Sequence, residues 1–163
     1  MAWSRVEKLN DSHDTNCFEC GLESVDNWLR TRAYANRQNV GTHMCICDPD
    51  EIVAFYALKT IIVATENFNS AQRSGSMDGQ ATGILLCQMG VSVSRQNGGL
   101  GKLLLKEAMQ AAVAVHQTSP VQLFIVDAEN EKLVTFYEKA GLKQLPGTLR
   151  LIAPMKTVVK SLN

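Results

Sequence analysis

The stretch from Arg95 to Lys102 has glycines at positions 98, 99 and 101 and a place in the chain that suits anion binding. The apolar run Ile84–Val93 precedes it, and Leu100–Val115 follows with helical spacing, which predicts a strand, a turn and a helix N-terminus. Glycines let a phosphate reach the backbone, while free N–H groups and the positive end of the helix dipole attract its charge. The residues that we predict to bind the phosphate are Gln96, Asn97, Gly98, Gly99, Leu100, Gly101 and Lys102.

Spacing distinguishes between the known kinds of phosphate turn. A P-loop requires glycine at position 96 and serine or threonine at 103, but the chain has Gln96 and Leu103. A dinucleotide-binding turn starting at Gly99 would require a further glycine where Leu104 stands. The pattern Q-x-x-G-x-G resembles instead the pyrophosphate-binding turn of GNAT N-acetyltransferases, which use acetyl-CoA. Taken alone, the turn is equally compatible with an ordinary strand-to-helix loop.

A second motif downstream also resembles the GNAT family. Asn130 precedes a predicted helix, Glu131–Ala140, which carries a Phe-Tyr pair ending in Tyr137 and is followed by Gly141. The family has an aromatic residue where this chain has Leu142. The resemblance implies that Asn130 contacts the cofactor and that the hydroxyl of Tyr137 protonates the departing thiolate. It also implies an acetyl-CoA cofactor and no metal.

The strand before the turn contains Gly90, which predicts a bulge or a close backbone approach. In GNAT enzymes this strand splays from its neighbour and offers backbone groups to the pantetheine arm. The resemblance therefore implies that Met89 and Val91 are cofactor-binding residues whose N–H groups hold the developing oxyanion.

The first half of the chain resembles a narrower group, the GNAT toxins of type II toxin–antitoxin pairs. The resemblance rests on Phe18-x-Cys20-Gly21, on the following segment Leu22–Leu29, and on the strand Val53–Leu58. It implies acetylation of the amino acid on charged tRNA, neutralisation by a ribbon-helix-helix antitoxin, and a homodimer. One departure is Gln88, where these toxins usually have arginine.

Three residues of the predicted first helix are candidates for contacting tRNA. Arg30, Tyr34 and Arg37 fall along one stripe with Asn27, and they mix guanidinium groups with an aromatic ring, which suits RNA phosphates or bases. The alternative is a solvated helix face. Lys plus Arg and Asp plus Glu both total 16, so there is no net charge to attract nucleic acid.

Composition places the chain among ordinary globular proteins. It has 163 residues, 45% hydrophobic and 20% charged, which predicts one domain over residues 1–163. The periodicity predicts an α/β (α+β) fold with a mixed central sheet and flanking helices, and the GNAT resemblance adds splaying of that sheet at the acetyl-CoA site. The elements that we predict are strands at Trp3–Leu9, Ile84–Val93, Val121–Val126 and Thr148–Met155, a hairpin over His43–Ala64, and a loop at Asn67–Gly83.

The cysteines and the N-terminus carry little further chemistry. Cys17 and Cys20 form one C-x-x-C, whereas a zinc ribbon has two, so we expect reduced thiols and no metal site. We find no transmembrane run and no signal-peptide pattern, which predicts a cytoplasmic protein.

The chemistry that these motifs imply is direct attack of a neutral amine on the thioester of acetyl-CoA. An α-amine, with a pKa of about 7.7–8.0, is much more easily neutral than a lysine, with a pKa of about 10.4, so no general base is needed. Two alternatives stay open. One is a GNAT enzyme acting on a small amine or a peptide N-terminus, and the other is a non-catalytic CoA-binding module.

Overall fold

The computed structural model describes residues 2–73, 75–76 and 78–163, and its mixed α/β architecture confirms the predicted fold class. In the described chain, seven strands follow the order β1-β2-β3-β4-β5-β7-β6 in one sheet. The strands are β1 (Arg5–Lys8), β2 (Gly41–Cys47), β3 (Glu51–Ala64), β4 (Gln80–Val91), β5 (Leu123–Asp127), β6 (Lys143–Gln144) and β7 (Arg150–Pro154). The helices are α1 (Glu23–Thr31), α2 (Ser70–Arg73), α3 (Leu100–Thr118), α4 (Glu131–Glu138) and α5 (Met155–Leu162), with a 3-10 turn, η1, at Val93–Arg95.

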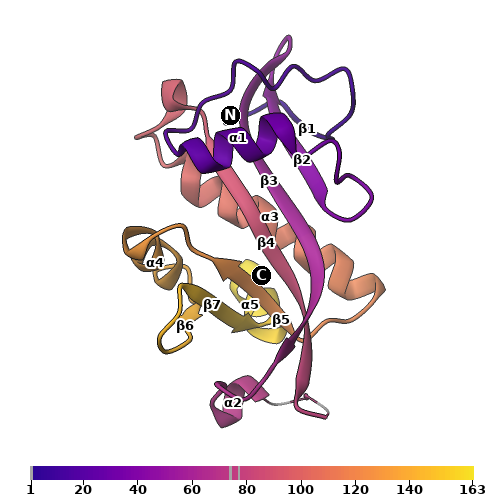
Figure 1. Ribbon diagram of the computed structural model, residues 1–163, viewed down its shortest axis with the longest axis vertical. Helices are drawn as coiled ribbons and strands as arrows, with labels where there is room; N and C mark the ends of the chain where they lie inside the picture. Colours follow the sequence, from indigo (N-terminus) through magenta and orange to yellow (C-terminus); the bar gives the residue numbers. More distant parts are fainter. Residues whose placement is uncertain (1, 74, 77) are drawn as a thin grey trace. The chain divides into compact units, whose positions relative to one another are not determined.

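The chain divides into two compact units, which we call unit 1 (residues 1–59 and 87–108) and unit 2 (residues 60–86 and 109–163). In unit 1, β1 pairs antiparallel with β2, and β2 pairs antiparallel with β3 from Gly41 opposite Leu58 to Cys47 opposite Glu51. This pairing confirms the predicted hairpin. Figure 1 shows α1 crossing one face of these strands.

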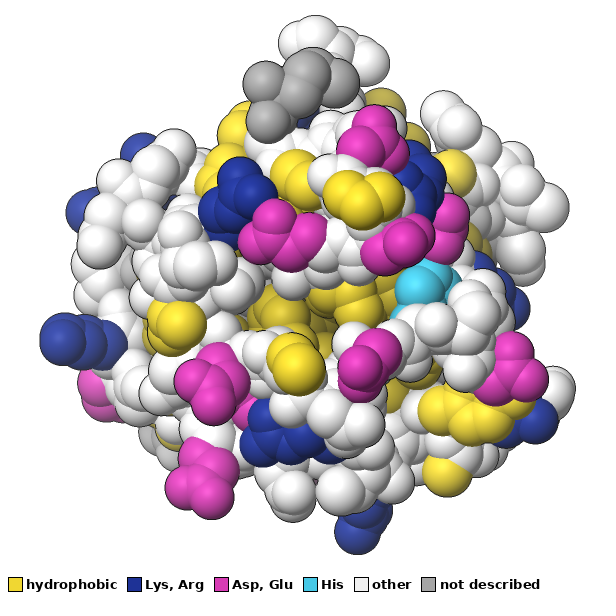
Figure 2. Space-filling model, turned by 90° about the horizontal axis from the view of Figure 1, so that it is seen from above, with side chains coloured by type: hydrophobic (Ala, Val, Ile, Leu, Met, Phe, Trp, Pro, Cys, Tyr) yellow, Lys and Arg dark blue, Asp and Glu magenta, His cyan; other side chains and the backbone are white. Residues whose placement is uncertain are grey.

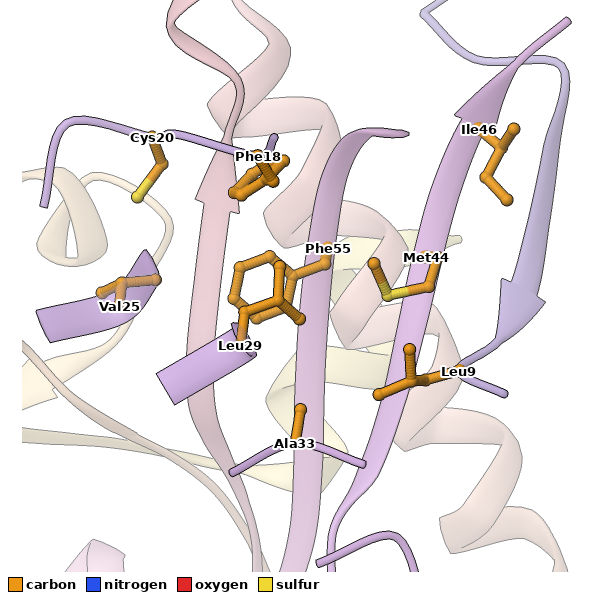
Figure 3. Packing of buried hydrophobic residues seen from close by; sticks show 9 residues of the cluster. All are labelled: Leu9, Phe18, Cys20, Val25, Leu29, Ala33, Met44, Ile46 and Phe55. Carbon is orange, nitrogen blue, oxygen red and sulfur yellow. The ribbon is translucent and has the colours of Figure 1, made fainter. Parts of the chain in front are cut away.

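Phe55 on β3 is the centre of the hydrophobic core in unit 1 (Figure 3). The ring of Phe18 meets it edge-on at 5.5 Å, and Trp28 stacks on it at 6.3 Å between ring centroids. Val25 and Leu29 lie four residues apart on α1 and are each only 2% exposed, so one face of the helix is buried. A nine-residue helix is marginal by itself in water, so this burial is what stabilises α1.

Unit 2 contains the parallel part of the sheet. β4 pairs with β5 from Gly83 opposite Leu123 to Leu86 opposite Val126, β7 pairs antiparallel with β5, and β6 pairs with β7. Parallel neighbours need a crossover connection, and the chain between β4 and β5 supplies it as α3. β4 continues to Val91, beyond the end of its pairing with β5. The core of this unit is formed by Phe68, Ala81, Leu123, Ile125, Leu145 and Ile152.

Several sequence-based boundaries were wrong. The helix predicted to extend through Arg37 ends at Thr31, because the chain turns over residues 32–39 instead. The predicted loop Asn67–Gly83 contains α2 and the start of β4, and its residues Ser74 and Met77 lie outside the described chain. A capping box explains α2: the N–H of Asn69 donates to Oε1 of Gln72, and the N–H of Gln72 donates to Oδ1 of Asn69, both at 2.9 Å.

At the C-terminal end, α4 stops at Glu138, two residues earlier than predicted, although Gly141 has the expected positive φ of 100°. Helix α5 was not predicted. No helix in the described part of the chain combines the length and the apolar character of a membrane span.

Candidate active site

The glycine-rich turn of unit 1 joins η1 to the N-terminus of α3, as the sequence predicts. Asn97 and Gly99 have φ angles of 69° and 77°, so the backbone alternates in hand through the turn. None of the backbone N–H groups from Asn97 to Lys102 donates a hydrogen bond to another described residue. A Cβ added at Gly99 would meet nothing within 4 Å, so the outer side of the turn is open. Free amides, an open side and a helix N-terminus together suit a phosphate group.

Gln96, the first residue of the motif, uses its side chain to hold the turn. Its Nε2 donates to the carbonyl oxygen of Cys20 at 2.6 Å and to that of Val91 at 2.8 Å. The side-chain amide is therefore engaged within the protein, while the backbone that follows it is free to bind a ligand. Arg95, just before it, pairs with Glu51 at 2.6 Å.

The end of β4 places Met89 and Val91 within unit 1 and beyond the pairing of β4 with β5. Between them, Gly90 confirms the predicted close approach: a Cβ there would lie 2.9 Å from Cβ of Cys20 and 3.4 Å from a ring carbon of Phe55. Gln88, where the toxins usually have arginine, has a buried Oε1 without a hydrogen-bond partner among the described residues. An unpaired buried acceptor costs about 1–3 kcal/mol, so Gln88 is a candidate for contact with a substrate donor.

Asn130 and Tyr137 lie in unit 2. Asn130 is the N-cap of α4, and its Oδ1 accepts the N–H of Leu133 at 3.1 Å. Tyr137 is 6% exposed, and its ring meets that of Phe136 edge-on at 5.2 Å. Burial, and next the negative charge of Glu129, raise the pKa of Tyr137 to about 12. At neutral pH the hydroxyl is therefore protonated.

The three tRNA candidates do not share a helical face. Arg30 is on α1, and its Nη1 donates to the carbonyl oxygen of Phe18 at 3.0 Å. Tyr34 and Arg37 follow the helix, and the guanidinium of Arg37 lies 4.1 Å from the ring centroid of Tyr34. Both of these residues are exposed, with Tyr34 at 40%. The prediction of a single stripe was wrong, and an exposed cation–π pair takes its place.

Charges of both signs are mixed on the face that the space-filling view shows. Figure 2 shows Lys and Arg side chains interspersed with Asp and Glu on the face seen from above. Within the described residues, no cluster of three or more His, Cys, Asp or Glu side chains could hold a metal ion. None of the five cysteines forms a disulfide in the described chain, and Cys20 and Cys45 are buried.

Sequence reasoning missed Asp26. This residue is only 5% exposed, and both of its carboxylate oxygens accept the N–H of Cys20, at 2.9 and 3.1 Å. The sequence shows Asp26 only as an acidic residue in the first turn of a predicted helix. Such residues are too common for this one to be recognised as buried.

Comparison with known proteins places the glycine-rich turn and the Asn130–Tyr137 motif within one family match. The model of the Acetyltransferase (GNAT) family matches residues 6–142. The tRNA-acetylating toxin of Mycobacterium tuberculosis (strain ATCC 25618 / H37Rv) is 29% identical over 136 residues, which is 83% of this chain and 81% of that protein.

Two solved structures share the fold. AtaT complexed with acetyl-methionyl-tRNAfMet has a TM-score of 0.86 at 20% identity, covering 98% of this chain and 99% of that one. A tyrosine-to-phenylalanine variant of AtaT, bound to the C-terminus of the antitoxin AtaR and acetyl-CoA, has a TM-score of 0.77 at 23% identity, covering 94% of each chain. Because the family match spans residues 6–142 and includes both the glycine-rich turn and the Asn130–Tyr137 motif, the chain belongs to the acetyltransferase (GNAT) family.

Proposed function

We propose that this protein is an acetyl-CoA-dependent N-acetyltransferase toxin that acetylates the α-amine of charged tRNA and thereby blocks translation. The observation that carries the proposal is the 29% identity, over 83% of the chain, to a tRNA-acetylating toxin. The fold shared with AtaT in complex with acetyl-methionyl-tRNAfMet supports the same substrate class.

The turn of unit 1 fits the pyrophosphate of acetyl-CoA. The free N–H groups from Asn97 to Lys102 would donate to the phosphate oxygens, and the positive end of α3 would favour their charge. Gln96 keeps the turn in place through its two carbonyl contacts. We assign the acetyl end to the N–H groups of Met89 and Val91, in the part of β4 that lies beyond its pairing with β5; the carbonyl of Val91 already accepts from Gln96.

Acetyl-CoA supplies an activated thioester when bound. The amine nitrogen would form the new bond to the acetyl carbon while the carbon–sulfur bond breaks. The sulfur would then need a proton, and the nitrogen would release one to solvent, from which the proton donor is restored. We assign the proton for the sulfur to Tyr137, whose pKa of about 12 keeps the hydroxyl protonated throughout the physiological range. An esterified α-amine is largely neutral near pH 8, so the proposal needs no general base.

The acceptor would be held by side chains of unit 1. Tyr34 and Arg37 offer an exposed ring and a cation, which suit a base and a phosphate of RNA. Gln88 offers an unpaired carbonyl oxygen that could accept a hydrogen bond from the attacking amine. Asn130 stays a candidate cofactor contact through the amide nitrogen of its side chain, since its oxygen caps α4.

The partners follow from the same proposal. AtaT has been solved with its antitoxin AtaR, and we infer that this protein is likewise neutralised by a small antitoxin of the ribbon-helix-helix class. We also propose a cytoplasmic homodimer, and a single GNAT domain because β3, β4 and α3 each run through both units. Analytical ultracentrifugation, and co-purification with the product of a neighbouring short reading frame, test these statements.

The decisive experiment is incubation of total charged tRNA with labelled acetyl-CoA. We expect label on the aminoacyl group, and none on deacylated tRNA. The Tyr137→Phe variant is the matched control, because it removes one hydroxyl from the same fold. Turnover of polyamines or peptide N-termini without labelling of any charged tRNA would refute the toxin assignment.

A second candidate is a GNAT enzyme that acts on a small amine or a peptide N-terminus. The balance of 16 basic and 16 acidic residues favours it, since no net charge attracts RNA. The third candidate, a CoA-binding module without turnover, requires that neither acceptor class is acetylated.

A further inference from the structure

Asp26 is a buried carboxylate to which the proposed chemistry gives no role. Burial of a carboxylate is unfavourable unless hydrogen bonds replace its water, and both oxygens of Asp26 accept the N–H of Cys20. Its place in the first turn of α1 adds the favourable field of the helix N-terminus. The carboxylate is therefore stabilised where it stands, and it points at the segment that precedes α1.

One peptide group connects Asp26 to the start of η1. The N–H of Cys20 donates to Asp26, and the carbonyl of the same peptide group, that of Glu19, accepts the N–H of Val93 at 2.8 Å. A negative charge on the N–H side polarises the peptide group, so it strengthens the bond that the carbonyl accepts. Val93 is the first residue of η1, which leads into the glycine-rich turn.

A second connection runs through Gln96. The carbonyl of Cys20 accepts from Nε2 of Gln96, and the same nitrogen donates to Val91. Thus the segment Glu19–Cys20 contacts both Val93, which begins η1, and Gln96, which directly follows η1. Gly21, with a φ of 95°, allows the chain to turn towards α1 directly after these contacts.

We propose that Asp26 is a positioning residue for the glycine-rich turn, acting through the Glu19–Cys20 peptide group and Gln96. The inference rests on the proposed function, because it takes the turn to hold the pyrophosphate of acetyl-CoA. Asp26 then sets the affinity for the pyrophosphate half of the cofactor and has little influence on the acetyl-pantetheine half.

The test compares two acetyl donors. Asp26→Asn keeps the shape of the side chain and removes its charge. We expect kcat/KM for acetyl-CoA to fall about tenfold, through KM, as a charge-assisted hydrogen bond is weakened. For S-acetylpantetheine, which has no pyrophosphate, we expect a change of less than about twofold.

Val25→Ala is the matched control. Val25 neighbours Asp26 on α1 and is 2% exposed, so this change loosens the packing of the helix without removing a hydrogen bond to Cys20. It should lower the melting temperature and leave the preference for acetyl-CoA over S-acetylpantetheine unchanged. A role of Asp26 in stability alone would make Asp26→Asn behave in the same way.

Gln96→Met provides a second, independent variant, because it keeps the length of the side chain and removes the donor to Cys20. This variant should also lose kcat/KM for acetyl-CoA and keep it for S-acetylpantetheine, and it can be measured even if Asp26→Asn does not fold. An unchanged preference in either folded variant, or an equal loss for both donors, would overturn the inference. Calorimetry with CoA tests the cofactor site separately from the role of Asp26. If the wild-type protein binds CoA and a Gly99→Asp variant does not, the cofactor site is supported whatever Asp26→Asn shows. Wild-type protein without affinity for CoA would overturn both proposals.

Discussion

Gly90 is a position in β4 where an added side chain would meet neighbours close to the glycine-rich turn. Its φ is not positive, so alanine is allowed by the backbone and any cost arises from contacts. The added Cβ would lie 2.9 Å from Cβ of Cys20, 3.0 Å from its Sγ and 3.4 Å from Cε1 of Phe55. Both neighbours are held in place, Cys20 by its hydrogen bonds to Asp26 and Gln96 and Phe55 by complete burial.

We expect Gly90→Ala to lower the free energy of unfolding by about 1–3 kcal/mol, the usual cost of overpacking. For a chain of this size, that loss corresponds to a fall in the melting temperature of about 2–12 °C. Urea denaturation followed by circular dichroism measures the free energy, and differential scanning calorimetry measures the temperature.

Substitution at Cys20 then tests the geometry. Cys20→Ala removes only the sulfur and keeps the 2.9 Å contact between the two Cβ atoms, so the double variant with Gly90→Ala should remain overpacked. Cys20→Gly removes both contacts, and its double variant should show a favourable coupling energy of about 1–2 kcal/mol in a double-mutant cycle. Wild-type stability of Gly90→Ala, or equal rescue by both substitutions, would refute the steric reasoning.

Four further predictions concern the proposed site. Gly99→Asp should bind CoA at least about tenfold more weakly than Gly99→Ala in calorimetry. Both variants have the same backbone strain from the positive φ, but only aspartate adds a negative charge. Equal affinities would place the phosphate elsewhere. Tyr137→Phe should lower kcat by about 10²- to 10⁴-fold, and since the pKa of Tyr137 is raised to about 12, the wild-type rate should show no loss from its ionisation up to about pH 10. A basic limb below that pH that vanishes in Tyr137→Phe would contradict the assignment. Arg37→Glu should weaken binding to charged tRNA and flatten its salt dependence by about one unit of slope, whereas Arg37→Lys should keep both; filter binding at several salt concentrations measures this. Gln88→Met should raise the free energy of unfolding by about 1–3 kcal/mol, because it removes an unpaired buried oxygen, while it slows acetylation of tRNA; a less stable variant would show that the oxygen has a partner in solution.

The sequence was most informative where function depends on the backbone. The glycines around Gly99 predicted the turn between a strand and a helix, because positive φ angles and close approach restrict the residues that can stand there. Gly141 and Gly90 were predictable for the same reason. The Asn130 N-cap preceding α4 is likewise a local pattern, and local patterns can be recognised without knowledge of the fold.

Side-chain roles were less predictable, because they depend on partners far away in the sequence. Gln96 matched the motif, but its contact with Cys20 joins residues 76 positions apart. Helical spacing placed Tyr34 and Arg37 on the stripe of Arg30, but α1 ends at Thr31. The end was missed because apolar periodicity does not determine where a helix stops. Arg30 contacts Phe18, so replacing it would disturb the segment before α1. Arg37 is therefore the cleaner probe of RNA binding.

The two outer strands of the sheet determine how another chain can approach. β1 has the charged residues Arg5, Glu7 and Lys8 along its four positions, and Arg5 also pairs with Asp48 and Asp50 beside the hairpin turn. At the other edge, β6 has only two residues. Short or charged outer strands resist the addition of a further strand, which would otherwise template aggregation. A disordered peptide that binds this protein is therefore expected to dock through side chains or as a helix, and not by β-augmentation at either edge.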